Sequence, residues 1–245
     1  MIDHVLKLIL SIDADAGVLL TGSAVLAINK ARDLDLIVIS NKDFLSLLKE
    51  KNLDRENIVD NSFRFYFKNK EIGIVSFTKR KITTKIRCII NGEDINLVYK
   101  SWAIGCEFPE GFLGDIRNSI ILKDTPDNFL KNIREKIQKN SSFLMNEIKR
   151  NSYNELATRL IQLKQAKASN NFITQNIIRT HIIIILIRLY FTSKGEYCRG
   201  IKHFLDYSDD QNLLYNQIKQ IVLGTIDLES FLEKEIKKYE EIEND

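Results

Sequence analysis

The spacing of apolar residues changes once along this chain, near residue 125, and that change constrains the fold more than any other feature. Before it, apolar residues form short runs rich in β-branched and aromatic members, such as residues 34–39 and 72–75, which are typical of strands. After it, apolar residues recur every three or four positions, as at Phe129, Ile133 and Ile137, which is typical of helices. We therefore predict an α+β domain, a mixed sheet with flanking helices, followed by an all-α helical bundle.

The predicted boundary separates residues 1–125 from residues 126–245, because Pro126 can occupy the first turn of the next helix. In the first domain we expect helices over 3–11 and 44–51. In the second we expect helices over 173–192, 209–223 and 227–241, with Gly195 and Gly224 acting as helix stops. Asn91-Gly92 lies between apolar runs at 86–90 and 95–99. It predicts a β-hairpin, because both residues tolerate positive φ.

Composition narrows the class of protein. The 245 residues include 36 Lys and Arg against 33 Asp and Glu, a balance of +3 that is too mild for a protein that coats nucleic acid. The three cysteines lack metal-ligand spacing and indicate a reducing compartment. The N-terminus carries acids where a signal peptide would be basic, and the most apolar stretch is interrupted by Arg188. We expect a soluble cytoplasmic protein in which that stretch is a buried core helix.

A glycine–serine pair and two aspartates carry the candidate chemistry of the first domain. Gly22 and Ser23 follow an apolar run and present a backbone N–H and a hydroxyl without bulk, which suits close approach of a phosphate. Asp33 and Asp35 lie two residues apart on one strand, so their side chains share a face at a spacing of about 7 Å. Such carboxylates repel each other unless a cation lies between them, and Mg²⁺ prefers carboxylates combined with substrate phosphates.

The order Thr21-Gly22-Ser23, nine residues, then Asp33-Leu34-Asp35-Leu36 resembles the signature of the nucleotidyltransferase superfamily, which includes DNA polymerase beta and the aminoglycoside nucleotidyltransferases. The resemblance implies a catalytic domain followed by a helical substrate-binding domain. It implies transfer of a nucleoside monophosphate from an NTP, with ATP the first choice, to an acceptor hydroxyl, with two Mg²⁺ ions. Asp33 and Asp35 would be catalytic metal ligands, and Gly22 and Ser23 would bind the nucleotide.

A third acid on a later strand, flanked by apolar residues, completes the metal site in this superfamily. On the strand expected at 95–99, the position with apolar neighbours is Asn96, and Asp94 lies two residues earlier on the same face. Either Asp94 is the third catalytic acid, or Asn96 is a neutral metal ligand that cannot deprotonate the acceptor. Residues 190–205 resemble, more loosely, the helix-loop-helix that lines the nucleotide in the second domain, and this would place Lys202 at the nucleotide.

The acceptor follows from the resemblance alone. A small hydroxyl compound, aminoglycoside-like, is the first expectation, and transfer to RNA or protein is the alternative among enzymes. A degenerate, non-catalytic nucleotide-binding module is the alternative outside enzymes, and Asn96 favours it. No membrane partner is expected. A basic cluster could attract triphosphate or RNA, although lysines around a hairpin more often protect a sheet edge; its members are Lys68, Lys70, Lys79, Arg80, Lys81, Lys85 and Arg87.

Overall fold

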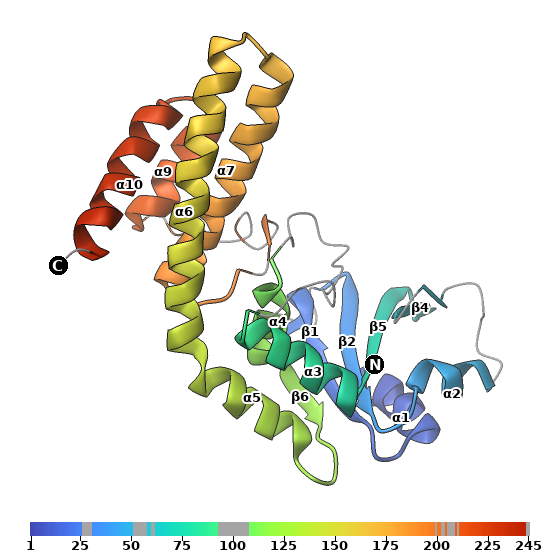
Figure 1. The fold of residues 1–245 in the computed structure, drawn as a ribbon. Helices are drawn as coiled ribbons and strands as arrows, with labels where there is room; N and C mark the ends of the chain where they lie inside the picture. Colours follow the sequence, from blue (N-terminus) through green and yellow to red (C-terminus); the bar gives the residue numbers. More distant parts are fainter. Residues whose placement is uncertain are drawn as a thin grey trace. The chain divides into compact units, whose positions relative to one another are not determined.

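The structure, a computed structural model, describes residues 1–25, 31–50, 58–59, 62–92, 108–198, 200–201, 204, 209 and 211–243 (Figure 1). The chain divides into two compact units. The first comprises Met1–Tyr99 with Phe112–Asn140, and the second Lys100–Gly111 with Ser141–Asp245. The first unit combines a mixed sheet with helices, and the second is helical, so the predicted fold class is confirmed. Helix α5 (Phe129–Lys139) belongs to the first compact unit, and the domain boundary after residue 125 stays a prediction.

Six described strands form one mixed sheet in the order β3-β4-β5-β2-β1-β6. Strands β2 and β5 are parallel, and the other neighbouring pairs are antiparallel. The bounds are β1 (Gly17–Thr21), β2 (Asp33–Ser40), β3 (Ile58–Val59), β4 (Ser62–Phe67), β5 (Lys70–Thr78) and β6 (Ile120–Lys123). The strands predicted around residues 34–39 and 72–75 are confirmed as β2 and β5, which lie side by side at the centre of the sheet.

One face of this sheet, here called the core face, packs with helices α1 (Ile2–Ile12) and α2 (Phe44–Glu50). Alternate residues of each strand point to it, as the period of two requires. Val5 and Ile9 of α1 and Phe44 and Leu48 of α2 are buried in the same cluster, and burial of these side chains holds both helices on the sheet. The strand residues of the core face are Val18, Leu20, Leu34, Leu36, Val38, Phe63, Ile72 and Ile74.

The opposite face carries the aspartates and is here called the carboxylate face. Its central residues are Gly17, Leu19, Thr21, Asp33, Asp35, Ile37, Ile39, Arg64, Glu71, Gly73, Val75 and Phe77, which cross-strand pairing places on one side. At one end of this face α5 packs so closely that a Cβ at Gly17 would lie 2.9 Å from Leu130. Phe77 meets Phe112 of α4 (Glu110–Asn118) edge to face, with ring centroids 5.4 Å apart.

The hairpin expected around Asn91-Gly92 is wrong where the structure describes it. Residues 86–90 belong to helix α3 (Lys79–Ile90), not to a strand. The Thr78 hydroxyl caps the helix by accepting from the Lys81 N–H at 3.2 Å, and Ile82, Ile86 and Ile89 form its buried stripe. Asn91-Gly92 ends the helix, with Gly92 at φ +64°. The run of β-branched residues favoured a strand, but burial along one helical face outweighed that preference.

The described part of the second unit includes the helices α6 (Ser141–Ala168), α7 (Phe172–Ser193), α9 (Leu213–Val222) and α10 (Leu228–Glu243). Within it α6 and α7 run side by side (Figure 1). Helix α7 is long and apolar enough to cross a membrane by length and composition. Its buried residues, however, join the cluster formed with α6, α9 and α10, which confirms the predicted core helix. Gly195 and Gly224 follow α7 and α9 at positive φ, as expected of helix stops.

Candidate functional site

The carboxylate face is polar where β2 begins and apolar farther along the strand. Two polar rows cross the sheet at the end where β2 begins: Tyr66, Glu71 and Asp33 form the first, and Arg64, Gly73, Asp35 and Thr21 form the second. The following rows contain Ile37, Val75 and Ile39, which are buried. The structure therefore brings Asp33 and Asp35 together on one half-buried patch, as their spacing predicted.

Asp35 is fitted into this patch by two glycines. Gly22 comes directly after β1, at φ +69°, and a Cβ built there would overlap a carboxylate oxygen of Asp35. On the other side, a Cβ at Gly73 would lie 3.1 Å from the second carboxylate oxygen. The Thr21 hydroxyl donates to the Asp35 carbonyl at 3.3 Å, which joins the ends of β1 and β2 at the same point. Because neither glycine has a side chain, the Asp35 carboxylate has room to lie between them.

Ser23 lies in the turn that directly follows β1. A short 3-10 helix, η1 (Gly22–Val25), follows β1, with Ala24 buried beneath it and Ser23 exposed. A serine hydroxyl exposed beside the Asp35 carboxylate is accessible to a ligand. Strand β1 ends at Thr21, so Gly22-Ser23 follows the strand instead of ending it, and it lies beside the strand that begins with two acids.

Glu71 is an acid of this patch that the sequence did not reveal as a candidate. It lies on β5 directly opposite Asp33, and neighbouring strands are about 4.8 Å apart. Arg64 on β4 donates from Nη1 to Glu71 Oε1 at 2.5 Å, and their side chains are 43% and 29% exposed. The signal for Glu71 was its place before the apolar run 72–75, but only the parallel register shows that it faces Asp33.

Three predicted site residues, Asp94, Asn96 and Lys202, lie outside the described residues. Their roles stay predictions. Because residues 86–90 form a helix, the hairpin that was expected to carry Asp94 and Asn96 is no longer a basis for placing them. Glu71 is the described acid that lies in register with the β2 pair.

The fit to a divalent cation rests on the donor set. Asp33 and Asp35 supply two hard carboxylate ligands, and Mg²⁺ commonly uses one or two carboxylates with substrate phosphates and water. Within the described ranges, no group of three or more His, Cys, Asp or Glu side chains is close enough together to hold a metal ion. Glu71 is directed toward Arg64 instead. The described residues thus fit a magnesium ion that arrives with its phosphate ligands.

Lys85 is a basic residue of α3 whose environment departs clearly from that of a solvated edge. Its side chain is buried on α3, with Nζ 4.9 Å from the ring centroid of Phe112 and 5.7 Å from that of Phe77. Burial lowers the pKa of Lys85 to about 8, because the charged form loses hydration. The expected basic hairpin is therefore divided between the β4–β5 turn and a helix.

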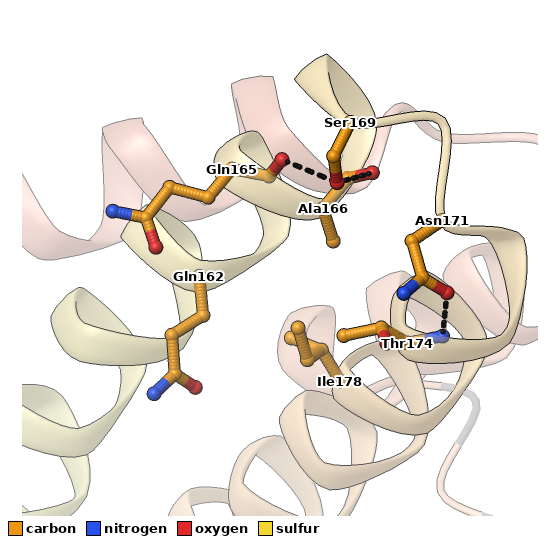
Figure 2. A pocket seen from close by; sticks show the side chains of 7 residues that line it. All are labelled: Gln162, Gln165, Ala166, Ser169, Asn171, Thr174 and Ile178. Carbon is orange, nitrogen blue, oxygen red and sulfur yellow. Dashed lines mark hydrogen bonds between the residues drawn. The ribbon is translucent and has the colours of Figure 1, made fainter.

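A shallow hollow of about 410 Å³ lies in the second unit, between the end of α6 and the start of α7 (Figure 2). The view shows amide and hydroxyl groups around it, with the Asn171 side chain capping α7 by accepting from the Thr174 N–H at 3.0 Å. Its lining is Gln162, Gln165, Ala166, Ser169, Asn171, Thr174 and Ile178. No titratable side chain lines it, so it offers hydrogen bonds but no acid or base.

Comparisons with known proteins give only distant likenesses, and these are to solved structures. A scan against models of protein families finds no match, and no curated protein matches the sequence. Among solved structures, the chain is similar to a nucleotidyltransferase-like protein from Exiguobacterium sibiricum 255-15. The match covers 98% of this chain and 74% of that one, with a TM-score of 0.48 and 12% identity. At this level of similarity, the function of the chain rests on its own site residues.

Proposed function

We propose that the protein is a magnesium-dependent nucleotidyltransferase, which moves a nucleoside monophosphate from an NTP, ATP in the first instance, to an acceptor hydroxyl. The observation that carries the proposal is the paired carboxylates of Asp33 and Asp35 at the start of β2, beside the Gly22-Ser23 turn that follows β1. Folding alone does not call for two half-buried acids on one strand face. A cation shared with phosphates explains both the acids and the glycine beside them.

Mg²⁺, when bound, would neutralise charge on the phosphates and lower the pKa of an acceptor hydroxyl. The chain's own residues do the rest. Asp33 and Asp35 hold the ligand positions, and the Gly22-Ser23 turn offers a backbone N–H and a hydroxyl to the phosphate tail. The acceptor oxygen forms a bond to the α-phosphorus, the bond from that phosphorus to the pyrophosphate oxygen breaks, and pyrophosphate leaves. The hydroxyl proton passes to a neighbouring carboxylate or to water.

Three residues compete for the part of third acid or third ligand. Glu71 lies opposite Asp33 and can reach the pair if its contact with Arg64 is exchanged. Asp94 and Asn96 are the alternatives predicted from the sequence. The variants Glu71→Gln and Asp94→Asn separate them, because general-base catalysis contributes about 10²–10⁴-fold and only the residue that acts should show such a loss.

For the acceptor we propose a small hydroxyl compound, selected by the helical second unit with Lys202 at the nucleotide. RNA or protein is the second acceptor class. The proposed location is the cytoplasm, where NTPs and Mg²⁺ are abundant. If the protein is instead a non-catalytic module, it binds the NTP in a metal-dependent way without consuming it.

Pyrophosphate release tests the proposal. Purified protein is incubated with Mg²⁺, each of the four NTPs, and pools of small hydroxyl compounds, RNA and proteins, with Asp35→Asn as the matched control. We expect pyrophosphate from the wild type with one pool and none from the variant. Metal-dependent NTP binding without pyrophosphate from any pool would favour the module. Equal turnover by wild type and variant would exclude the site.

A further inference from the structure

Arg64 is the cation of the two polar rows on the carboxylate face, and it lies on β4, which carries none of the residues of the proposed mechanism. Its strand, β4, alternates strictly: Phe63 and Phe65 join the core face, and Arg64 points to the opposite side. Arg64 pairs directly with Gly73, which in turn pairs with Asp35. Arg64 and Asp35 therefore lie in one row of the sheet, on either side of a residue that has no side chain.

The spacing across Gly73 suits an anion between the two groups. Each step between neighbouring strands is about 4.8 Å, so the Cα atoms of Arg64 and Asp35 are roughly 10 Å apart. Asp35 leans over Gly73, since a Cβ on that glycine would meet its carboxylate at 3.1 Å. A phosphate attached to a cation at Asp35 would thus lie within reach of a guanidinium extended from β4.

Glu71 gives the guanidinium its direction. The 2.5 Å contact from Nη1 to Oε1 draws Arg64 along the sheet toward the row that contains Asp33. Both side chains are partly exposed, at 43% and 29%, and an ion pair in such surroundings contributes little to stability. A phosphate, which accepts two parallel hydrogen bonds from arginine as a carboxylate does, can therefore replace Glu71 at low cost.

We propose that Arg64 is a further phosphate-binding residue of this site, on the side of Asp35 opposite the Gly22-Ser23 turn, and the one that determines its specificity; Glu71 holds it until a metal-bound triphosphate takes the place of Glu71. This inference rests on the proposed function. The guanidinium binds the part of the triphosphate beyond the α-phosphate, so that the site distinguishes a triphosphate from a single phosphate. Release of Glu71 in the same exchange leaves its carboxylate beside Asp33.

Titration calorimetry measures the binding of two probes that carry no nucleobase. They are the magnesium complex of inorganic tripolyphosphate, and inorganic phosphate with Mg²⁺. Arg64→Gln should weaken tripolyphosphate binding about 10- to 100-fold, as expected for loss of charge-assisted hydrogen bonds. Arg64→Lys should retain part of the affinity, because it keeps the charge but loses the paired donors. Phosphate binding should change much less. The matched control, Arg80→Gln, removes the same charge from an exposed position on α3 and should behave as wild type.

Metal binding alone separates a phosphate ligand from a structural residue. Binding of Mn²⁺ is followed by the electron paramagnetic resonance signal of the free ion. Arg64→Gln should bind Mn²⁺ as tightly as wild type or more tightly, because a positive charge near the carboxylates is gone. Equal losses of Mn²⁺ binding, tripolyphosphate binding and thermal stability would mean a structural role and overturn the inference. Unchanged tripolyphosphate binding in Arg64→Gln, combined with loss in Asp35→Asn, would overturn it and leave the proposed function intact. No tripolyphosphate binding by the wild type would overturn both.

Discussion

The two faces of the sheet differ most at the end where β2 begins. On the core face, Leu34 and Ile72 are fully buried against the α1 and α2 side of the sheet. On the carboxylate face, the residues that directly precede them in the same strands, Asp33 and Glu71, are half-buried and polar. One strand end thus serves as core on one side and as a cluster of acids on the other. Since burial of apolar side chains is the main force for folding, the fold does not require these acids, and the proposed function assigns Asp33 to a cation ligand.

Asp35→Asn tests the carboxylate face and carries the largest expected effect. The amide keeps the shape of the side chain but removes a charged ligand, so transfer should fall by more than about 10²-fold, the loss that follows removal of one key electrostatic contact. Stability should stay the same or rise, because repulsion from Asp33 is relieved. Transfer is measured by pyrophosphate release and stability by urea unfolding. A variant that unfolds as it loses activity would make Asp35 a structural residue.

Leu36→Ala tests the core face at the adjacent position. Leu36 is 2% exposed, and loss of its buried methyl groups should lower the free energy of unfolding by about 2–5 kcal/mol. Metal-dependent triphosphate binding per folded molecule should persist, because the side chain points away from the acids. Urea unfolding and calorimetry on the same preparation give both quantities. If the folded Leu36→Ala variant no longer binds the triphosphate, the two faces are not independent.

Lys85→Met sharpens the comparison within the carboxylate face, where that face is covered. The folded-state pKa of about 8 lies below the value of about 10.4 in an unfolded chain, so keeping Lys85 protonated in the folded state at pH 7 costs free energy. The resulting destabilisation is full below pH 8 and is relieved as pH rises from about 8 to about 10.4. The Met variant should be more stable at pH 7 by about 1–3 kcal/mol, and the difference should shrink by pH 10. Thermal unfolding at both pH values checks this; a difference that does not depend on pH would contradict it.

Gly22→Ala compared with Gly92→Ala carries the smallest expected difference. Both glycines have positive φ, +69° and +64°, so each alanine should cost about 1 kcal/mol. Only Gly22 has the Asp35 carboxylate against it, while a Cβ at Gly92 meets nothing within 4 Å. Gly22→Ala should therefore destabilise the protein further and weaken Mn²⁺ binding, and Gly92→Ala should leave Mn²⁺ binding unchanged. Equal effects of the two variants on metal binding would remove Gly22 from the site.

The sequence predicted those parts of the fold and site that local spacing determines. The pair Asp33 and Asp35 and the Gly22-Ser23 turn follow from a period of two and from backbone freedom, and all four lie where expected. The run 86–90 was misread because β-branched composition resembles a strand, while the helical stripe of Ile82, Ile86 and Ile89 decided the outcome.

Glu71 and Arg64 show what local spacing cannot supply. Their places beside Asp33 and Gly73 depend on strand order and on the parallel register of β2 and β5. Residues 38 positions apart in sequence, Asp33 and Glu71, share a row only because the intervening segment returns as a neighbouring strand. Neither residue lies in a motif, and the place of Glu71 before the apolar run 72–75 does not by itself show that it faces Asp33.

A crystal structure with Mg²⁺ and a non-hydrolysable triphosphate tests the central claim most directly. The account predicts a cation bound by the carboxylates of Asp33 and Asp35 and by phosphate oxygens, with the phosphate tail at Gly22-Ser23. A triphosphate bound elsewhere, or one bound at the turn with no cation at the two aspartates, would contradict it.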